Sequence, residues 1–161
     1  MTTIRLARPE EYAIIGELAV DAYAEADNLP ADGSYRPVLR NAADRAAEAE
    51  LLVALDGDKP VGTVTVVRPG SSYSEIAGEG ELEFRMLAVS PQAAGRGIGR
   101  ALVRAVFERA RAERFARVVL CVQDEAAVPR RLYESMGFRR LPERDWSPTP
   151  GIDLLGYYLD L

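Results

Sequence analysis

The sequence predicts one mixed α/β domain, of the α+β type, that spans residues 1–161. Three observations lead to this class. Apolar residues recur at helical spacing in the first 24 residues, and β-rich runs separated by turn residues follow between 51 and 89. A glycine-rich turn then precedes an amphipathic stretch, and a short apolar run typical of a buried parallel strand comes next. An antiparallel meander therefore leads into a strand–turn–helix–strand unit.

The first half of the chain is punctuated by proline, glycine and acidic residues. Pro9 suits the first position of a helix, and Glu10 and Glu11 are favourable beside the positive end of the helix dipole. Residues 56–59 form a hairpin turn between two strands. The elements expected here are a strand at 4–7, a helix at 9–24, a loop at 27–34, a helix at 37–47, strands at 51–55 and 61–67, and a polar loop at 70–80.

The second half contains equally clear stop signals. Ser90 and Pro91 end a long strand, and Gly137 suits the left-handed C-cap of a helix. The prolines at 142, 148 and 150 indicate a loop. The elements expected here are a strand at 81–89, the glycine-rich turn at 95–99, a helix to about 114, a strand at 118–122, a helix at 128–136 and a final strand at 152–159.

Composition excludes several classes of function. The 20 Lys and Arg against 25 Asp and Glu give a net charge of −5, which argues against nucleic-acid binding. No apolar run approaches the roughly 20 residues of a membrane span, and no signal-peptide pattern is present, so a cytoplasmic protein without a membrane partner is expected. Cys121 is the only cysteine and there is no histidine. Internal disulfides, serine triads, Cys-His dyads and His-ligated metals are therefore excluded, and we expect no metal site.

The glycine-rich turn is the strongest local signal. Gly95, Gly97 and Gly99 alternate with other residues between a strand and a helix, where free N–H groups bind anions. This pattern favours a phosphate ligand over a purely structural turn. It is not a Walker loop, because Gly99 is followed by Arg100 and not by Lys. Its spacing also differs from G-x-G-x-x-G, so a dinucleotide-binding domain remains the weaker alternative.

Two segments resemble the landmarks of a known family. The run 87–91 leading into Ala94-Gly95-Arg96-Gly97-Ile98-Gly99 is similar to the acetyl-CoA signature of the GCN5-related N-acetyltransferases (GNATs), and 132–138 is similar to that family's second landmark. The resemblance implies the GNAT fold, a mostly antiparallel sheet with a central splayed parallel strand pair, flanked by helices. It also implies acetyl-CoA as the cofactor.

The resemblance further implies a cofactor site. Pantetheine would pair with the main chain between the splayed strands 81–89 and 118–122, an N–H of Leu87 or Ala88 would polarise the thioester, and the glycine turn would hold the pyrophosphate. Three positions depart from the family pattern: Ala94, where Gln or Arg is usual, Ala126, where Asn is frequent, and Pro129, where Ala is frequent. The implied cofactor-binding residues are Leu87, Ala88, Val89, Ala94, Gly95, Arg96, Gly97, Ile98, Gly99, Arg100 and Tyr133.

Acetyl transfer needs a base and an acid. An amine with a pKa of about 10.4 must lose a proton before attack, and without histidine a carboxylate is the natural acceptor. Glu83 lies four residues before Leu87 on the expected central strand and is the predicted base, with Glu81 or a water chain in reserve. Tyr133, in the second landmark, is the predicted acid for the leaving thiolate.

The predicted function is an N-acetyltransferase that moves an acetyl group from acetyl-CoA to a primary amine by direct transfer. The alternative is a non-catalytic acyl-CoA-binding or regulatory module on the same fold. Acids outnumber bases before Pro91 and bases outnumber acids after it, so the acceptor is expected to be cationic, as a small amine or a peptide or protein amine. A homodimer formed through the terminal strand is a further possibility. Asp21, Tyr23, Tyr35, Arg36, the 70–80 loop and the end strand near Tyr157 lie where the family forms its acceptor pocket.

Overall fold

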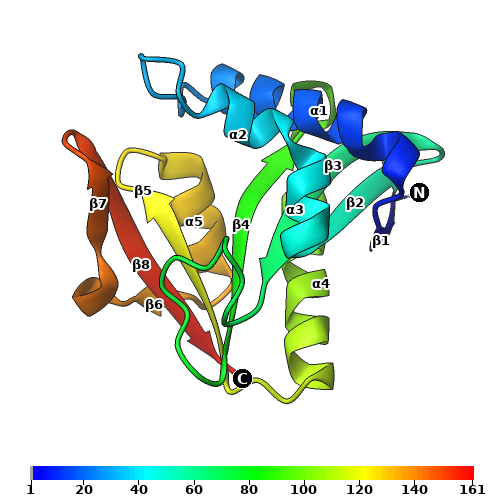
Figure 1. Ribbon diagram of the computed structural model, residues 1–161. Coiled ribbons are helices and arrows are strands. Elements are labelled where there is room, and N and C mark those ends of the chain that lie inside the picture. The colour runs from blue at the N-terminus through cyan, green and yellow to red at the C-terminus, as the bar shows by residue number, and fades with distance from the viewer. Residues whose placement is uncertain (1) are drawn as a thin grey trace.

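An eight-stranded sheet forms the centre of the protein, shown as a computed structural model that describes residues 2–161 (Figure 1). Its strands follow the order β1-β2-β3-β4-β5-β8-β6, and β7 pairs with β8 beside this path. Every pairing is antiparallel except that of β4 with β5. The strands are β1 (Thr2–Leu6), β2 (Glu50–Asp56), β3 (Lys59–Val67), β4 (Glu81–Val89), β5 (Arg117–Gln123), β6 (Arg139–Arg140), β7 (Trp146–Thr149) and β8 (Ile152–Asp160). The predicted fold class is confirmed.

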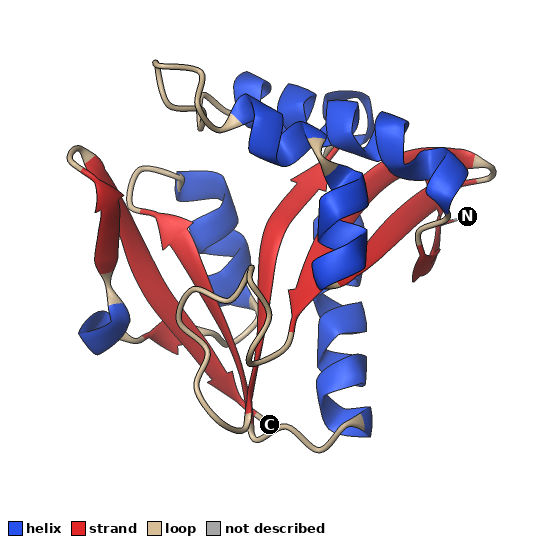
Figure 2. Cartoon of the chain, viewed as in Figure 1, coloured by secondary structure: helices blue, strands red, loops and turns tan. Residues whose placement is uncertain are grey.

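Helices cover both faces of this sheet (Figure 2). The largest apolar cluster joins α4 and Tyr133 of α5 to one face, whereas two smaller clusters join α1, α2 and α3 to the other. The helices are α1 (Tyr12–Glu25), α2 (Arg36–Arg40), α3 (Ala42–Glu48), α4 (Ile98–Ala112) and α5 (Ala127–Ser135), with short 3-10 turns at Pro9–Glu11, Pro91–Ala93 and Pro142–Arg144. Among residues 2–161, no helix combines the length and hydrophobicity that crossing a bilayer requires.

The parallel pair of strands opens partway along its length. β4 and β5 are in register only from Glu81 to Glu83, and beyond this point the two strands diverge, as their arrows show in Figure 1. A bulge in β4 accompanies the divergence, because its register with β3 shifts between Arg85 and Ala88. Met86 has a φ of 55°, which costs a non-glycine residue about 1 kcal/mol. The bulge turns Met86 and Ala88 toward α1, while Leu87 and Val89 pack beside α4 and α5.

Two expected elements differ from those observed. The helix expected at 37–47 is two helices, because the side chain of Asn41 accepts a hydrogen bond from the N–H of Asp44 (3.2 Å) and begins α3 anew. The loop expected around Pro148 instead contains β7, which pairs with β8 through Trp146 and Thr149. Proline is tolerated here because β7 is a short strand at the sheet edge.

The terminal strand is not a free edge for a second copy of the chain. Within residues 2–161, β8 pairs with β5 on one side and with β6 and β7 on the other. The homodimer expected through the terminal strand stays a prediction, and its interface would have to include β6 and β7.

Candidate functional site

A cavity of about 540 Å³ occupies the opening between β4 and β5. Its wall comprises residues 84–86 of β4, residues 120–123 of β5 and two further parts. We call one part the glycine-turn side: it comprises residues 87–89 of β4, the turn at 94–100, and α5. We call the other the loop side: it comprises the end of α1 with residues 26–35, the 68–80 loop, and the β7–β8 hairpin. The 68–80 loop crosses in front of the paired part of β4 and β5 in Figure 1.

Strand β4 lines the cavity with residues 84–89, and the last three of these lie at and beyond the bulge. Leu87, Ala88 and Val89 all line the cavity, and Ala88 is buried whereas Leu87 and Val89 are half-buried. Past Glu83, no strand pairs with the β5-facing edge of β4 in the described chain. An extended ligand can therefore add to this edge as a further strand does.

The glycine turn presents a row of free donors at the start of α4. Gly97 is the N-cap, and Gly95 and Gly97 have φ values of 81° and 75°, which only glycine adopts at little cost. A Cβ at either position would meet nothing within 4 Å, so this surface is open. The N–H groups from Gly95 to Arg100 make no hydrogen bond to any described residue. Ala94 and Gly99 line the cavity, so the donors stand at its rim.

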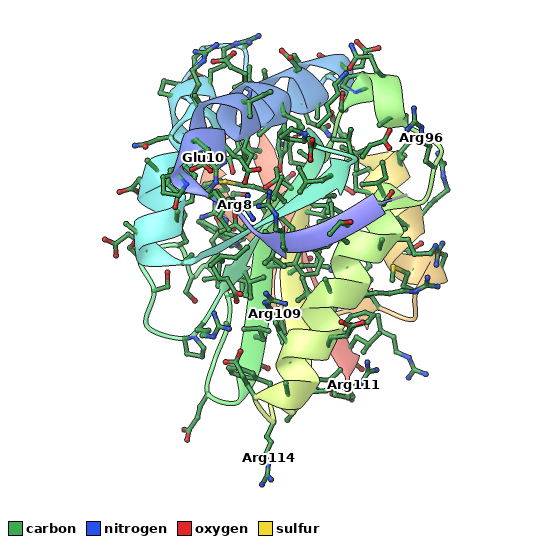
Figure 3. The ribbon with its side chains drawn as sticks, turned by 90° about the vertical axis from the view of Figure 1, so that its right-hand side faces the viewer. Arg8, Glu10, Arg96, Arg109, Arg111 and Arg114 are labelled. Carbon is green, nitrogen blue, oxygen red and sulfur yellow. The ribbon has the colours of Figure 1, made fainter. Side chains whose placement is uncertain are left out.

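The other turn residues have different surroundings. Ile98 is buried in the core and anchors the start of α4. Arg96 extends from the turn, and Arg114 follows the opposite end of α4 (Figure 3). The Arg96 side chain pairs with Asp56 at 3.0 Å, and Arg100 donates to Ser135 Oγ at 2.9 Å. Both predicted phosphate contacts are thus near the turn but engaged with protein partners, in exposed interactions that contribute little to stability.

Two departures from the family pattern lie at the start of α5. Ala126 is its N-cap, makes no side-chain cap hydrogen bond, and lines the cavity. Pro129 lies in the first turn, where a helical N–H has no partner within the helix, so proline costs α5 no hydrogen bond.

Tyr133 of α5 reaches the cavity from the core. Its ring packs edge-on against Phe84 and Phe138, with centroid separations of 5.7 and 5.8 Å. Its hydroxyl makes no hydrogen bond to another described residue, and burial raises its pKa well above the ordinary value. The hydroxyl therefore stays protonated at neutral pH and free to donate.

Glu83 does not line the cavity. It is fully buried, and its carboxylate accepts hydrogen bonds from the N–H groups of Glu75, Ile76 and Ala77 at 3.0 to 3.1 Å. Glu81, the reserve base, accepts from the N–H of Gly78 at 2.6 Å and contacts Arg144. Glu83 and Glu81, the predicted base and its reserve, thus accept hydrogen bonds from the backbone of the 68–80 loop. Neither carboxylate lines the cavity.

Two carboxylates line the cavity, those of the exposed Glu25 at the end of α1 and of the half-buried Glu75 in the 68–80 loop. Glu75 is the one held by the protein. It pairs with Arg85 at 3.0 Å, and burial raises its pKa. The sequence placed the 70–80 loop at the acceptor pocket but could not distinguish Glu75 from Glu79 within it, because an irregular loop has no periodicity. Only the fold shows that Glu75 is turned inward while Glu79 is exposed.

The remaining residues expected near the acceptor are only partly brought together. Tyr23 and Tyr35 line the cavity, whereas Asp21 and Arg36 are exposed and do not. Tyr157 is buried elsewhere: its hydroxyl donates to Glu134 at 2.7 Å.

One group of side chains has the composition of a metal site. Ligand atoms of Glu75, Glu83 and Cys121 lie within 4.8 Å of one another. The Glu83 oxygens already accept backbone hydrogen bonds, and burial raises the pKa of the Cys121 thiol to about 12. Trp146 Nε1 also donates to the sulfur, at 3.5 Å. These atoms are committed to protein contacts and do not form an open coordination set.

Comparisons with known proteins agree with this geometry. The sequence profile described as the acetyltransferase (GNAT) family matches residues 9–138. Among curated proteins, the N-acetylaspartate synthetase of Danio rerio is 37% identical over 71 residues, which cover 44% of this chain and 25% of that protein. A second relative, from Mus musculus, is 43% identical over 65 residues, or 28% of its length. The chain therefore matches only about a quarter of the length of these relatives.

Solved structures share the fold over the whole chain. The PaiA N-acetyltransferase of Thermoplasma acidophilum, determined in complex with coenzyme A, has a TM-score of 0.80 at 14% identity and covers 100% of this chain and 99% of its own. A GNAT-family acetyltransferase from Staphylococcus aureus has a TM-score of 0.78 at 18% identity, with 100% and 99% coverage. At such identities the likeness establishes the fold alone.

Proposed function

The chain belongs to the acetyltransferase (GNAT) family, and from this premise we propose that it transfers an acetyl group from acetyl-CoA to a primary amine, directly and in a ternary complex. The observation that carries the proposal is the open edge of β4, which ends at a turn where six N–H groups have no hydrogen-bond partner among residues 2–161. These features provide a strand-like channel for pantetheine and an anion site for the pyrophosphate.

The residues present fit this cofactor. Leu87 and Val89 would pair with pantetheine, Gly95 to Arg100 would hold the phosphates, and Ala94 adds no polar contact. When bound, acetyl-CoA supplies an activated acetyl thioester and leaves as a thiol. The N–H of Leu87 or Ala88, displaced by the bulge at Met86, is the proposed donor to the thioester oxygen.

Direct transfer is favoured over an acyl-enzyme path. Cys121 is the one thiol on the cavity wall, and burial raises its pKa to about 12, so it is not an activated nucleophile. The sequence contains no histidine that could deprotonate a serine or cysteine.

Tyr133 is the proposed general acid. Its Oη–H supplies the proton for the leaving sulfur, and burial keeps this hydroxyl protonated. A sulfur released into the same cavity also loses hydration, and the raised pKa of Cys121 indicates how strongly this environment favours a protonated thiol. Burial raises the pKa of the Tyr133 phenol too, so the two shifts offset each other and the phenol remains a proton donor matched to the leaving thiolate.

The acceptor is proposed to be a cationic amine. The charged side chains on the cavity wall are Glu25, Glu75 and Arg85, so acids outnumber bases by one. An ammonium group is attracted by this excess. The name of the Danio rerio relative supports an alternative, an amino acid whose carboxylate faces Arg85.

Two assays test the function. Calorimetry with acetyl-CoA, CoA, NAD and ATP should give heat of binding for the first two alone, because neither a Walker loop nor a dinucleotide spacing is present. CoA release should then be measured on a panel of polyamines, amino sugars, amino acids including aspartate, and peptides. Binding of CoA without turnover on any amine would favour the non-catalytic module, and preference for aspartate over spermidine would overturn the cationic acceptor.

A further inference from the structure

We propose that Glu75 is the general base of the acetyl transfer and that Glu83 is the residue that positions it. This inference rests on the proposed function and assigns the proton-accepting role to a loop residue. It separates two carboxylates that lie close together and gives each a different task.

Glu83 holds the backbone of the 68–80 loop in place through hydrogen bonds. Its Oε1 accepts from the N–H groups of Glu75, Ile76 and Ala77, at 3.0, 3.1 and 3.0 Å, and Oε2 lies 3.2 Å from the N–H of Glu75. Successive N–H groups converging on one anion form a nest that fixes the backbone. Because the Glu75 N–H is part of it, Glu83 sets directly where the Glu75 side chain begins.

Glu75 lies on the cavity wall, where the acceptor would bind. Its side chain is 17% exposed and lines the cavity, whereas Glu83 is fully buried and does not. Arg85 holds it from one side at 3.0 Å, and the same guanidinium donates to Tyr35 Oη at 3.3 Å. The carboxylate is thus fixed by neighbours on β4 and after α1, with one side toward the open space.

The surroundings of Glu75 strengthen it as a proton acceptor. Burial raises its pKa, Arg85 lowers it, and the charge of Glu83 raises it again, with a net increase. The groups that face it from the packed elements are Arg85 and Glu83 of β4, Cys121 of β5, and Tyr35. A carboxylate with a raised pKa is a stronger base for an ammonium than an exposed glutamate.

The proton balance follows from the reaction. The acceptor ammonium gives its first proton to a Glu75 oxygen, and the electron pair of the broken N–H bond stays on nitrogen. That pair forms the new N–C bond as the C–S bond breaks, and its electrons go to sulfur, which takes the proton of Tyr133. The nitrogen then loses its second proton, which restores the Tyr133 hydroxyl, and Glu75 returns its proton to solvent. One proton is released per amide formed.

The test compares Glu75→Gln with Glu79→Gln, a matched change at an exposed residue of the same loop. On the amine that gives the fastest CoA release with the natural protein, Glu75→Gln should lower kcat at least about 100-fold at pH 7, and Glu79→Gln should stay within about 2-fold. The acidic limb of the kcat/KM profile should disappear in Glu75→Gln. In the residual activity of Glu83→Gln this limb should move to lower pH, since the charge that raises the Glu75 pKa is gone.

A readout without ligand completes the test. Carbon-13 NMR of the side-chain carboxyls should reveal one group titrating above the ordinary glutamate value of about 4.3, absent from Glu75→Gln and present in Glu79→Gln. If Glu75→Gln turns over within about 3-fold of the natural protein, the base is overturned while the function stands. If the natural protein acetylates no amine although it binds CoA, the proposed function fails and the base fails with it.

Discussion

The two sides of the cavity are constructed on different principles. The glycine-turn side uses main-chain groups of consecutive residues, from Leu87 to Arg100, whose positions follow from one strand, one turn and one helix. The loop side uses side chains and irregular segments held by contacts distant in sequence, such as Tyr73 to Asp44 and Arg144 to Glu81. The glycine-turn side needs little besides local geometry, whereas the loop side depends on a few buried charges. A substitution on one side should therefore impair the function of that side and leave the other side intact.

The largest effect should come from removing the charge of Glu83, which holds the 68–80 loop. In Glu83→Gln the amide replaces an anion that accepts three backbone N–H groups, which should destabilise the protein by about 3 kcal/mol. Without its support Glu75 loses its position, so kcat should fall at least about 100-fold, while the Kd for CoA should change less than about 2-fold. Urea unfolding, steady-state kinetics and calorimetry measure the three quantities. Equal damage to CoA binding would show that the two sides are not independent.

The second substitution is on the glycine-turn side. Gly97→Val places a β-branched residue at a φ of 75°, at a cost of about 1–2 kcal/mol, and crowds the row of N–H groups. Calorimetry should give a CoA Kd raised at least about tenfold.

The matched control is Gly70→Val on the loop side. Gly70 has a φ of 92°, so the backbone strain is similar, and a Cβ there would also meet nothing within 4 Å. It should destabilise the protein comparably and leave the CoA affinity unchanged. A loss of CoA binding in both variants would mean that instability, and not the anion site, explains Gly97→Val.

The third change tests the proposed acid on α5, in the glycine-turn side. Tyr133→Phe removes the proposed acid, and kcat should fall about tenfold or more at pH 7 with the CoA Kd within about 2-fold. Tyr23→Phe removes a hydroxyl from the loop side of the same cavity and should alter only the KM for the acceptor. Rapid-quench kinetics separate these effects. Unchanged turnover in Tyr133→Phe would eliminate its role as the acid.

The same contrast explains what sequence could predict. The 81–89 strand, the glycine turn and the positive φ of Gly137 were accessible because each is encoded by neighbouring residues. The capping role of Asn41 was not anticipated, and it divides one expected helix into two. Nor was the inward position of Glu75, because it depends on Glu83 and Arg85 in another element. Sequence placed Glu83 and Glu81 on the central strand, but it could not show that the 68–80 loop covers both carboxylates.

The smallest predicted effect is that of low pH, which should destabilise the loop side before the rest of the protein. Burial raises the pKa of Glu81, but hydrogen bonds from Arg144 and the N–H of Gly78 outweigh it and leave the pKa lowered. A carboxylate with a lowered folded pKa stabilises the protein above its unfolded value of about 4.3, and this stabilisation is lost as pH falls through the folded value. The loss should be about 1 kcal/mol, since the Arg144 partner is partly exposed. Hydrogen exchange should therefore report a falling protection factor at Gly78 below about pH 4.5, while amides inside α4 stay protected. Glu81→Gln should remove this pH dependence, and simultaneous loss of protection in α4 and the loop would contradict the separation of the two sides.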